Sequence, residues 1–176
     1  LPVRHKEVLR RRLVGIYCID DFDGSGMADY ILGPNEELYA LLILHPRVFS
    51  MSASELITFR DNTAFRDDDP DTELVVDISE EVSGLEYIVL HESTHIVDYV
   101  ERHTPYVEPN MLELFGRSPG DTAFSDEVWQ DYSLPRSSAD FEFRNELKFY
   151  GLGGDSSVSN RDLEAAVREK SFREDL

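Results

Sequence analysis

The hydrophobic pattern changes along the chain, from short apolar runs to a helical spacing. Residues 13–19 are apolar and rich in β-branched side chains, and residues 39–44 form a continuous apolar run that ends before Pro46. Both patterns predict strands, and the second is typical of a buried strand. Residues 52–60 predict a short helix, and residues 73–78 predict another strand after an exposed acidic loop.

A long helix is predicted over residues 80–103. This stretch has no proline, its only glycine is Gly84, and its apolar residues recur at spacings that place them on one face of a helix. Residues 104–135 contain several prolines and predict irregular chain with a short helix over 111–115. The apolar positions of the long helix are Leu85, Ile88, Val89, Ile96, Val97 and Val100.

Two more helices are predicted towards the C-terminus. Ser137 or Ser138 can cap a helix that runs to about Tyr150, where glycines follow. Ser159 or Asn160 can cap a last, charged helix.

These elements combine into an α+β fold with a small mixed sheet packed on the long helix. A length of 176 residues suits one domain and is too short for two comfortable ones, so residues 1–176 are predicted to form a single domain. Its N-terminal part, about 13–103, holds the sheet and the long helix. Its C-terminal part, about 104–176, holds the remaining helices.

The composition excludes several classes of partner and site. The chain has 17 Lys and Arg against 36 Asp and Glu, a formal net charge of −19, so the backbone of a nucleic acid would be repelled. No apolar stretch approaches the roughly 20 residues of a membrane-spanning helix. With Cys18 as the single cysteine, an internal disulfide and a cysteine-ligated zinc ion are excluded. A metal ion must then be held by histidines and carboxylates.

The first twelve residues are basic, unlike the rest of the chain. We expect them to form a helix or arm that pairs with the acidic body of the same protein. The basic residues are Arg4, Lys6, Arg10, Arg11 and Arg12.

Within the predicted long helix, His91, Glu92 and His95 form the pattern HExxH. Because a helix turns once per about 3.6 residues, His91 and His95 share a face, and both imidazoles can bind one metal ion. Glu92 lies one position further on, near enough to take a proton from a water on that metal. The residues around the motif are uncharged in a chain that is 30% charged, which is typical of a helix packed behind a cleft. The pattern predicts a zinc site with Glu92 as general base on zinc-bound water.

A second pair of carboxylates offers a third metal ligand. Glu142 and Glu146 are four residues apart and share a face of the helix predicted there. One of them can bind the metal while the other hydrogen-bonds a ligand histidine, and the spacing does not choose between them. Asp98 lies on the same face as the two histidines and can accept a hydrogen bond from the Nδ1 of an imidazole.

The sequence HESTHIVDY over 91–99, followed by EFRNE over 142–146, resembles the gluzincin branch of the zincin metallopeptidases. Within that branch it is most similar to the lethal-factor and Pro-Pro endopeptidase group. The resemblance covers about a quarter of the chain and implies a zincin-like fold. The site residues that it implies are His91, His95 and Glu142 as zinc ligands, Glu92 as general base, and Glu146 in support of the ligands.

The same group places a catalytic tyrosine about two helical turns before its ligand glutamate, where this chain has Pro135. Tyr132 is the nearest tyrosine and is the first candidate for stabilising the oxyanion, with Tyr106 as the second.

These residues predict a zinc-dependent metalloendopeptidase with one catalytic zinc ion and a peptide or protein as substrate. An edge strand would hold the peptide in extended form, and residues 48–51 or 63–65 are expected to supply it. The acidic surplus favours cleavage of basic or neutral peptides over acidic ones. The alternative is a non-catalytic, acidic surface module that keeps the zincin fold and binds zinc or calcium. We expect a secreted or periplasmic protein rather than a cytoplasmic one.

A second metal site, for calcium, is suggested by the turn after the first predicted strand. Asp21, Asp23, Ser25 and Asp29 occupy positions 1, 3, 5 and 9 of an EF-hand-like loop, but position 12 is Leu32 instead of the glutamate that closes such a loop. A plain turn rich in aspartate explains the same residues. Any calcium binding there is therefore expected to be weak.

Overall fold

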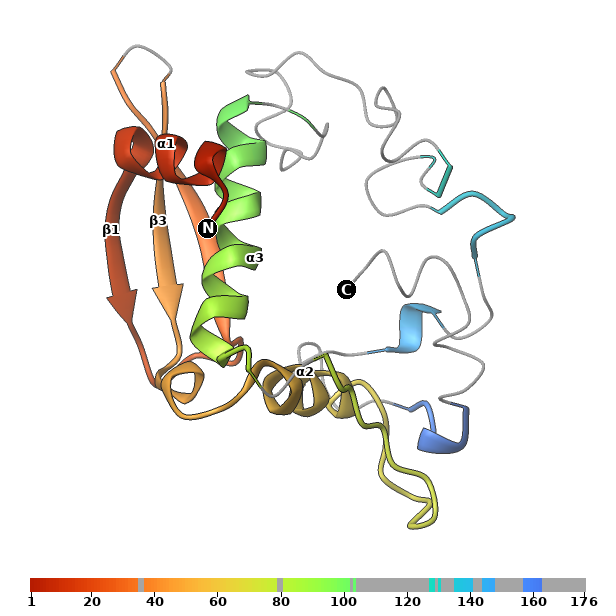
Figure 1. Ribbon diagram of the computed structural model, residues 1–176. Helices are drawn as coiled ribbons and strands as arrows, with labels where there is room; N and C mark the ends of the chain where they lie inside the picture. Colours follow the sequence, from red (N-terminus) through yellow and green to blue (C-terminus); the bar gives the residue numbers. More distant parts are fainter. Residues whose placement is uncertain are drawn as a thin grey trace.

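The computed structural model of the chain describes residues 1–34, 37–78, 81–101, 103, 127, 128, 130, 135–140, 144–147 and 157–162. Within these residues, three α-helices and a three-stranded sheet form a small α+β fold (Figure 1). The predicted class of fold is confirmed at that level. None of the helices in the described part of the chain is both long and apolar enough to cross a lipid bilayer.

The sheet is mixed, with β3 in its centre. β1 (Leu13–Cys18) runs parallel to β3 (Leu38–Leu44), and β2 (Gly26–Leu32) runs antiparallel to it. The two strands predicted from the hydrophobic pattern are confirmed as β1 and β3. The pattern does not predict β2, because Ala28 and Asp29, which are weak strand formers, interrupt its apolar residues. Among the residues that the structure describes, β2 pairs on one side only and forms an edge of the sheet.

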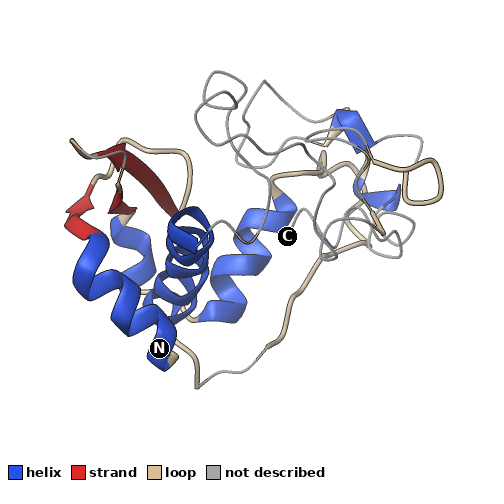
Figure 2. Cartoon of the chain, turned by 90° about the horizontal axis from the view of Figure 1, so that it is seen from above, coloured by secondary structure: helices blue, strands red, loops and turns tan. Residues whose placement is uncertain are grey.

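α1 (Val3–Arg12) and α3 (Gly84–Glu101) cover one face of the sheet, and α2 (Ala53–Asn62) packs beside the first turns of α3 (Figures 1 and 2). α2 confirms the short helix predicted over 52–60. The core lies between these helices and the inward side of β3. One cluster of buried residues is Leu42, Leu44, Val48, Leu56 and Ile88, and the other is Val8, Ala40, Ile96 and Val97.

α3 confirms the predicted long helix, with a later start. Ser83 and Glu86 exchange hydrogen bonds: the Ser83 amide and hydroxyl donate to the Glu86 carboxylate at 3.1 and 2.8 Å, and the Glu86 amide donates to the Ser83 hydroxyl at 3.2 Å. This reciprocal capping begins the helix at Gly84. The glycine is needed there because a Cβ would lie 2.8 Å from the carbonyl oxygen of Met51. Ile88, Ile96 and their buried neighbours fix which side of α3 faces inward.

The basic start of the chain pairs with acidic residues, as predicted. Arg4 forms ion pairs with Glu7 at 3.1 Å and with Glu101 of α3, and Arg12 lies 3.3 Å from Glu37. These pairs are partly exposed to solvent, so they orient α1 and add little to the free energy of unfolding.

Residues 73–78 do not form the predicted strand. The backbone of this segment is hydrogen-bonded to side chains of α2 instead. The Thr58 hydroxyl accepts from the Val76 amide at 2.9 Å, and the Asn62 side-chain amide donates to the Leu74 carbonyl at 2.9 Å. The apolar run is therefore held against a helix and not against a neighbouring strand.

The helix predicted to carry both C-terminal glutamates is not found in the described residues. Residues 136–140 form a turn in which the Arg136 carbonyl accepts from the amides of Ala139 and Asp140 at 2.8 and 3.1 Å. After it, η3 (Arg144–Glu146) is a single turn of 3₁₀ helix. Aspartate and phenylalanine, which make up residues 140, 141 and 143, are weak helix formers, so local propensity does not support an α-helix here.

The last predicted helix is described only in its first turn. This turn, η5 (Asn160–Asp162), is again of the 3₁₀ type. The short helix predicted over 111–115 lies outside the described residues.

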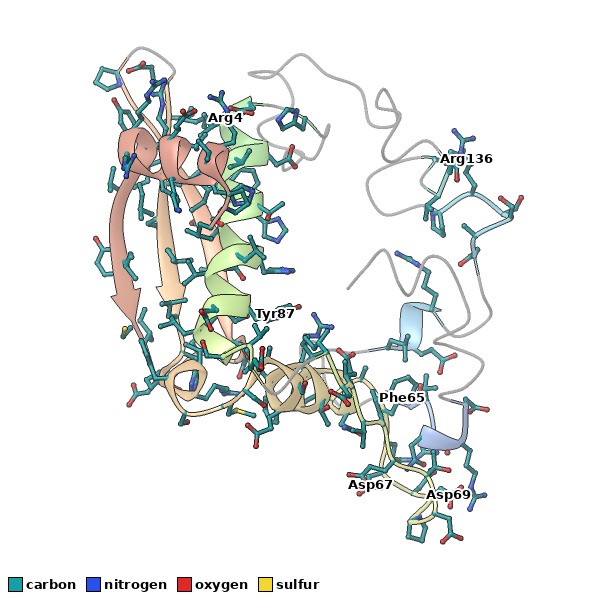
Figure 3. The ribbon with its side chains drawn as sticks, in the orientation of Figure 1. Arg4, Phe65, Asp67, Asp69, Tyr87 and Arg136 are labelled. Carbon is teal, nitrogen blue, oxygen red and sulfur yellow. The ribbon has the colours of Figure 1, made fainter. Side chains whose placement is uncertain are left out.

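The acidic loop after α2 binds the segment 157–162, and we call this pairing the Asn160 clamp (Figure 3). The Asn160 amide donates to the Arg66 carbonyl at 3.0 Å, and its side chain accepts from the Asp69 amide at 3.0 Å and donates to the Asp69 carbonyl at 2.9 Å. Asn160 is buried, so these bonds form away from competing water. The clamp ties the C-terminal part of the chain to the end of α2.

Candidate metal centre

His91 and His95 project from successive turns of α3, on the face that also carries Tyr99, whose ring centroid lies 5.4 Å from that of Tyr30 in β2. Tyr87, one turn earlier on α3 (Figure 3), has its ring centroid 5.9 Å from that of His91. The two imidazoles meet edge to face, with centroids 4.9 Å apart and their Nε2 atoms 3.2 Å apart. The structure therefore brings the two rings together, as their spacing of four residues predicts.

The separation of the two nitrogens suits a shared zinc ion. Zinc binds imidazole nitrogen at about 2.0–2.1 Å in a tetrahedral arrangement, which places two ligand nitrogens about 3.3 Å apart. The 3.2 Å between the Nε2 atoms of His91 and His95 is close to that value. A hydrogen bond between the rings has a similar length, and it requires one Nε2 to carry the proton. Two imidazoles are a donor set that zinc favours, so these residues fit the ion that the motif implies.

Both histidines are held in the neutral form that binds metals. Burial, together with the positive charges of His95 and Arg60, lowers the pKa of His91 from 6.5 to about 4. Burial also lowers the pKa of His95, although part of its ring is open to solvent, and the nearby Asp98 opposes that shift. At neutral pH no proton needs to leave either ring before a metal ion binds.

Glu92 lies on the inward side of the motif, against the edge strand β2. Its side chain is buried, and a Cβ at Gly26 would lie 3.0 Å from its Cγ and Oε1 atoms, so the glycine leaves room for it. The Ala28 amide donates a hydrogen bond to the Glu92 carboxylate. Burial raises the pKa of Glu92 from 4.5 to about 7, and the Ala28 amide partly opposes the shift. A carboxyl group with a pKa near neutrality is suited to take up and return a proton.

Every second residue of β2 directs its backbone N–H and C=O groups to the side of the strand opposite β3. Hydrogen bonds from the His45 amide to the Ser25 carbonyl, at 3.0 Å, and from the Gly33 amide to the Glu37 carbonyl, at 2.8 Å, flank the ladder between β2 and β3. In an antiparallel pair, the N–H and C=O of one residue point to the same side. The odd-numbered residues of β2 therefore bond to β3. The even-numbered residues direct their backbone groups to the side on which no described strand pairs with β2, and we call this side the open edge of β2. This open edge runs past Glu92.

The expectation that residues 48–51 or 63–65 supply the strand at the site is wrong. The first segment overlaps η1 (Pro46–Phe49), and the second is the turn that ends α2. Both segments lie at helix ends, where the backbone bonds are local. The strand that lies beside Glu92 is β2.

Ser93, inside the motif, fastens α3 to α1. Its hydroxyl group donates to the Leu90 carbonyl at 3.0 Å and lies 2.8 Å from the Nδ1 of His5. Ser93 is 1% exposed and bound to both helices, so its hydroxyl group serves to hold α3 against α1. HExxH leaves this position unspecified, and the sequence therefore gives no signal for its role.

A buried ion pair at the end of α2 also lies near the histidines. Arg60 Nε is 2.6 Å from Asp61 Oδ1, and the two side chains are 13% and 4% exposed. Burial raises the pKa of Asp61, and the hydrogen bond and charge of Arg60 oppose the rise. The guanidinium group, after burial and His95, is a further cause of the lowered pKa of His91. Adjacent Arg and Asp residues are common on exposed helices, so the sequence did not identify this pair.

Two of the remaining predicted site residues, Asp98 and Glu146, lie in the described part of the chain, and their roles stay predictions. Asp98 lies near enough to His95 to affect its pKa, and Glu146 accepts a hydrogen bond from the hydroxyl group of Ser157. Within the described residues, no group of three His, Cys, Asp or Glu side chains is placed to hold a metal ion. The third zinc ligand stays a prediction, because Glu142 lies outside the described residues, as do the oxyanion candidates Tyr132 and Tyr106.

The residues of the predicted calcium loop are spread over a turn and a strand. Asp21 and Asp23 lie in the turn between β1 and β2, Ser25 is buried, and Asp29 lies within β2, where its carboxylate accepts from the Tyr30 amide at 2.8 Å. Calcium binding at this turn stays a prediction.

Comparison of the chain with protein-family models, with curated proteins and with solved structures found no match. The function is therefore argued from the site itself.

Replacing Glu92 by glutamine should change how the stability of the metal-free protein depends on pH. As the pH rises from 4.5 to about 7, the unfolded chain loses the Glu92 proton while the folded chain keeps it, so the free energy of unfolding falls across that window. The shift corresponds to about 3 kcal/mol at most. Urea unfolding should show Glu92→Gln to be more stable than the wild type at pH 8 and equal to it at pH 4. The destabilisation from His91 below pH 6.5 is common to both proteins and cancels. A constant difference between the proteins at all pH values would contradict this assignment.

Proposed function

We propose that the chain is a zinc-dependent metalloendopeptidase with a zincin-like fold. His91 and His95 bind the ion with Glu142 as third ligand, supported by Asp98 and Glu146, and Glu92 is the general base. One observation carries the proposal: in the same stretch of α3, two neutral imidazoles have their nitrogens 3.2 Å apart, and the residue next to the first of them is a buried carboxyl group with a pKa near 7.

The chemistry of the site follows from the positions of its side chains. A bound zinc ion supplies a water of lowered pKa and polarises the substrate carbonyl. Glu92 accepts the proton of the attacking water and returns it to the amine that leaves when the peptide bond breaks. The Ala28 amide keeps the carboxylate from rotating away. Tyr132 is proposed to donate a hydrogen bond to the oxyanion.

The open edge of β2 is proposed to hold the substrate. An extended peptide that adds to the edge of a sheet gains main-chain hydrogen bonds without demanding a particular sequence. Because this edge passes Glu92, a peptide bound along it would bring its backbone to the general base. The charge of −19 favours basic or neutral peptides over acidic ones.

The placement of Glu92 argues against a non-catalytic metal-binding module. Burial of an ionised carboxylate without a positive partner lowers the stability of the fold. A structural zinc site needs only its ligands, and a neutral side chain at position 92 would serve it better. A buried carboxyl group at this position is therefore better explained by proton transfer than by metal binding alone.

The function is tested by metal analysis and peptide cleavage together. We expect one zinc ion per chain, and we expect mass spectrometry to show cleavage of synthetic basic and neutral peptides faster than acidic ones at low salt. A chelator should abolish cleavage, and zinc should restore it. Zinc without cleavage would favour the non-catalytic module, and a protein without stoichiometric zinc would contradict both functions.

A further inference from the structure

The open edge of β2 carries carboxylates of its own chain at two neighbouring positions. The Ala28 amide donates to Glu92, and the Tyr30 amide donates to Oδ1 of Asp29 at 2.8 Å. Ala28 and Tyr30 are two residues apart in one strand, so both amides point to the same side, about 7 Å from one another. At these two amides, a carboxylate oxygen therefore occupies the place where a carbonyl oxygen of an added strand would bind.

The two carboxylates differ in how firmly they are held. Glu92 is buried between α3 and β2, whereas Asp29 is exposed. Asp29 is an odd-numbered residue of β2, paired with Leu41 of β3, so its own backbone groups belong to the ladder and its side chain reaches round to the open edge. Its removal would leave the ladder and the core unchanged.

Aspartate is also an unfavourable residue in the middle of a strand. A local choice that conflicts with the element around it is expected where a residue serves function more than stability. The contact with the Tyr30 amide gives Asp29 such a role.

We propose that Asp29 is a gate on the open edge of β2, which competes with the substrate main chain for the Tyr30 amide. The proposal rests on the proposed function in taking an extended peptide as the ligand. A peptide carbonyl can bind the Tyr30 amide only after the Asp29 side chain has rotated away. Asp29 thus sets how readily a peptide binds the edge at Tyr30, while Glu92 stays bound to the Ala28 amide.

The gate is tested first by kinetics, with the peptide that the wild type cleaves fastest. Asp29→Ala should lower KM about three- to tenfold, the range expected when one competing exposed hydrogen bond is lost, with kcat unchanged. Asp29→Asn keeps an acceptor without the charge and should give an intermediate KM. Asp20→Ala, in the neighbouring turn, removes the same charge from an exposed position and should leave KM at the wild-type value.

Amide hydrogen exchange at Tyr30 gives a second measurement that does not depend on cleavage. In Asp29→Ala the Tyr30 amide should exchange faster than in the wild type, and a synthetic basic octapeptide should slow it again. If the wild type cleaves no peptide but the octapeptide protects Tyr30, the proposed function fails and the gate stands. If cleavage occurs but KM in Asp29→Ala stays unchanged or rises, or if the variant only self-associates through β2, the gate is overturned and the proposed function stands.

Discussion

Replacing Glu92 by glutamine is expected to slow peptide cleavage about 1,000-fold while one zinc ion stays bound. Glutamine has nearly the same shape and can still accept from the Ala28 amide, so the packing between α3 and β2 is kept. It cannot take a proton from the attacking water, and general acid–base catalysis by a positioned side chain contributes 10²–10⁴-fold. The measurement is kcat/KM on one peptide, with zinc content determined on the same samples.

Glu86→Gln is the matched control for this variant. It makes the same chemical change on the same helix, and glutamine can replace glutamate in the capping pair with Ser83. Cleavage by this variant should equal that of the wild type. If Glu92→Gln keeps more than a tenth of the wild-type rate, Glu92 is not the general base.

Replacing His95 by alanine is expected to weaken zinc binding more than about 100-fold. Changes in residues that merely orient a metal ligand already cost 10- to 100-fold in affinity, and the loss of a direct ligand costs more. His95 is exposed, so the variant should fold normally, which circular dichroism can check. Competition with a zinc chelator gives the affinity.

His103→Ala provides the control for His95. His103 lies just beyond the end of α3, exposed and 2.9 Å from Glu101, away from the paired rings. The variant should bind zinc with wild-type affinity. If His95→Ala does the same, the 3.2 Å contact of His95 with His91 is a hydrogen bond between the rings and not a metal site.

The sequence predicts the central strand β3 and the edge strand β1 but misses the edge strand β2, and burial together with residue type explains the difference. β3 lies between two strands and under two helices, so burial imposes a continuous apolar run that can be recognised by itself. β2 has one neighbour, and its residues alternate between half-buried and exposed, with Asp29 among the exposed ones. The open edge of β2, which we propose as the substrate site, is thus the part of the sheet that leaves the weakest hydrophobic signal.

At the site, the sequence predicts contacts within one helix but not contacts between distant parts of the chain. The spacing of His91 and His95 is set within one helix, so a regular helix alone brings their rings together. The contacts of Glu92 with Gly26 and Ala28 join residues more than sixty positions apart. No local pattern encodes such a contact, and only the packing of α3 on β2 creates it. The helix predicted from Ser137 or Ser138 to about Tyr150 depended on local signals alone, a serine cap and the glycines that follow, and the described residues there do not form it.

The Asn160 clamp has a consequence for the order of folding. Its hydrogen bonds join Arg66 to Ser157 and Asp69 to Asn160, each pair 91 positions apart, and closing a loop of that length costs about 4 kcal/mol of chain entropy. α1, the sheet, α2 and α3 form their cores without it. The clamp should therefore close late, after α3 has already paired its histidines. A metal ion shared between α3 and the C-terminal part would shorten the remaining loop and speed that last step.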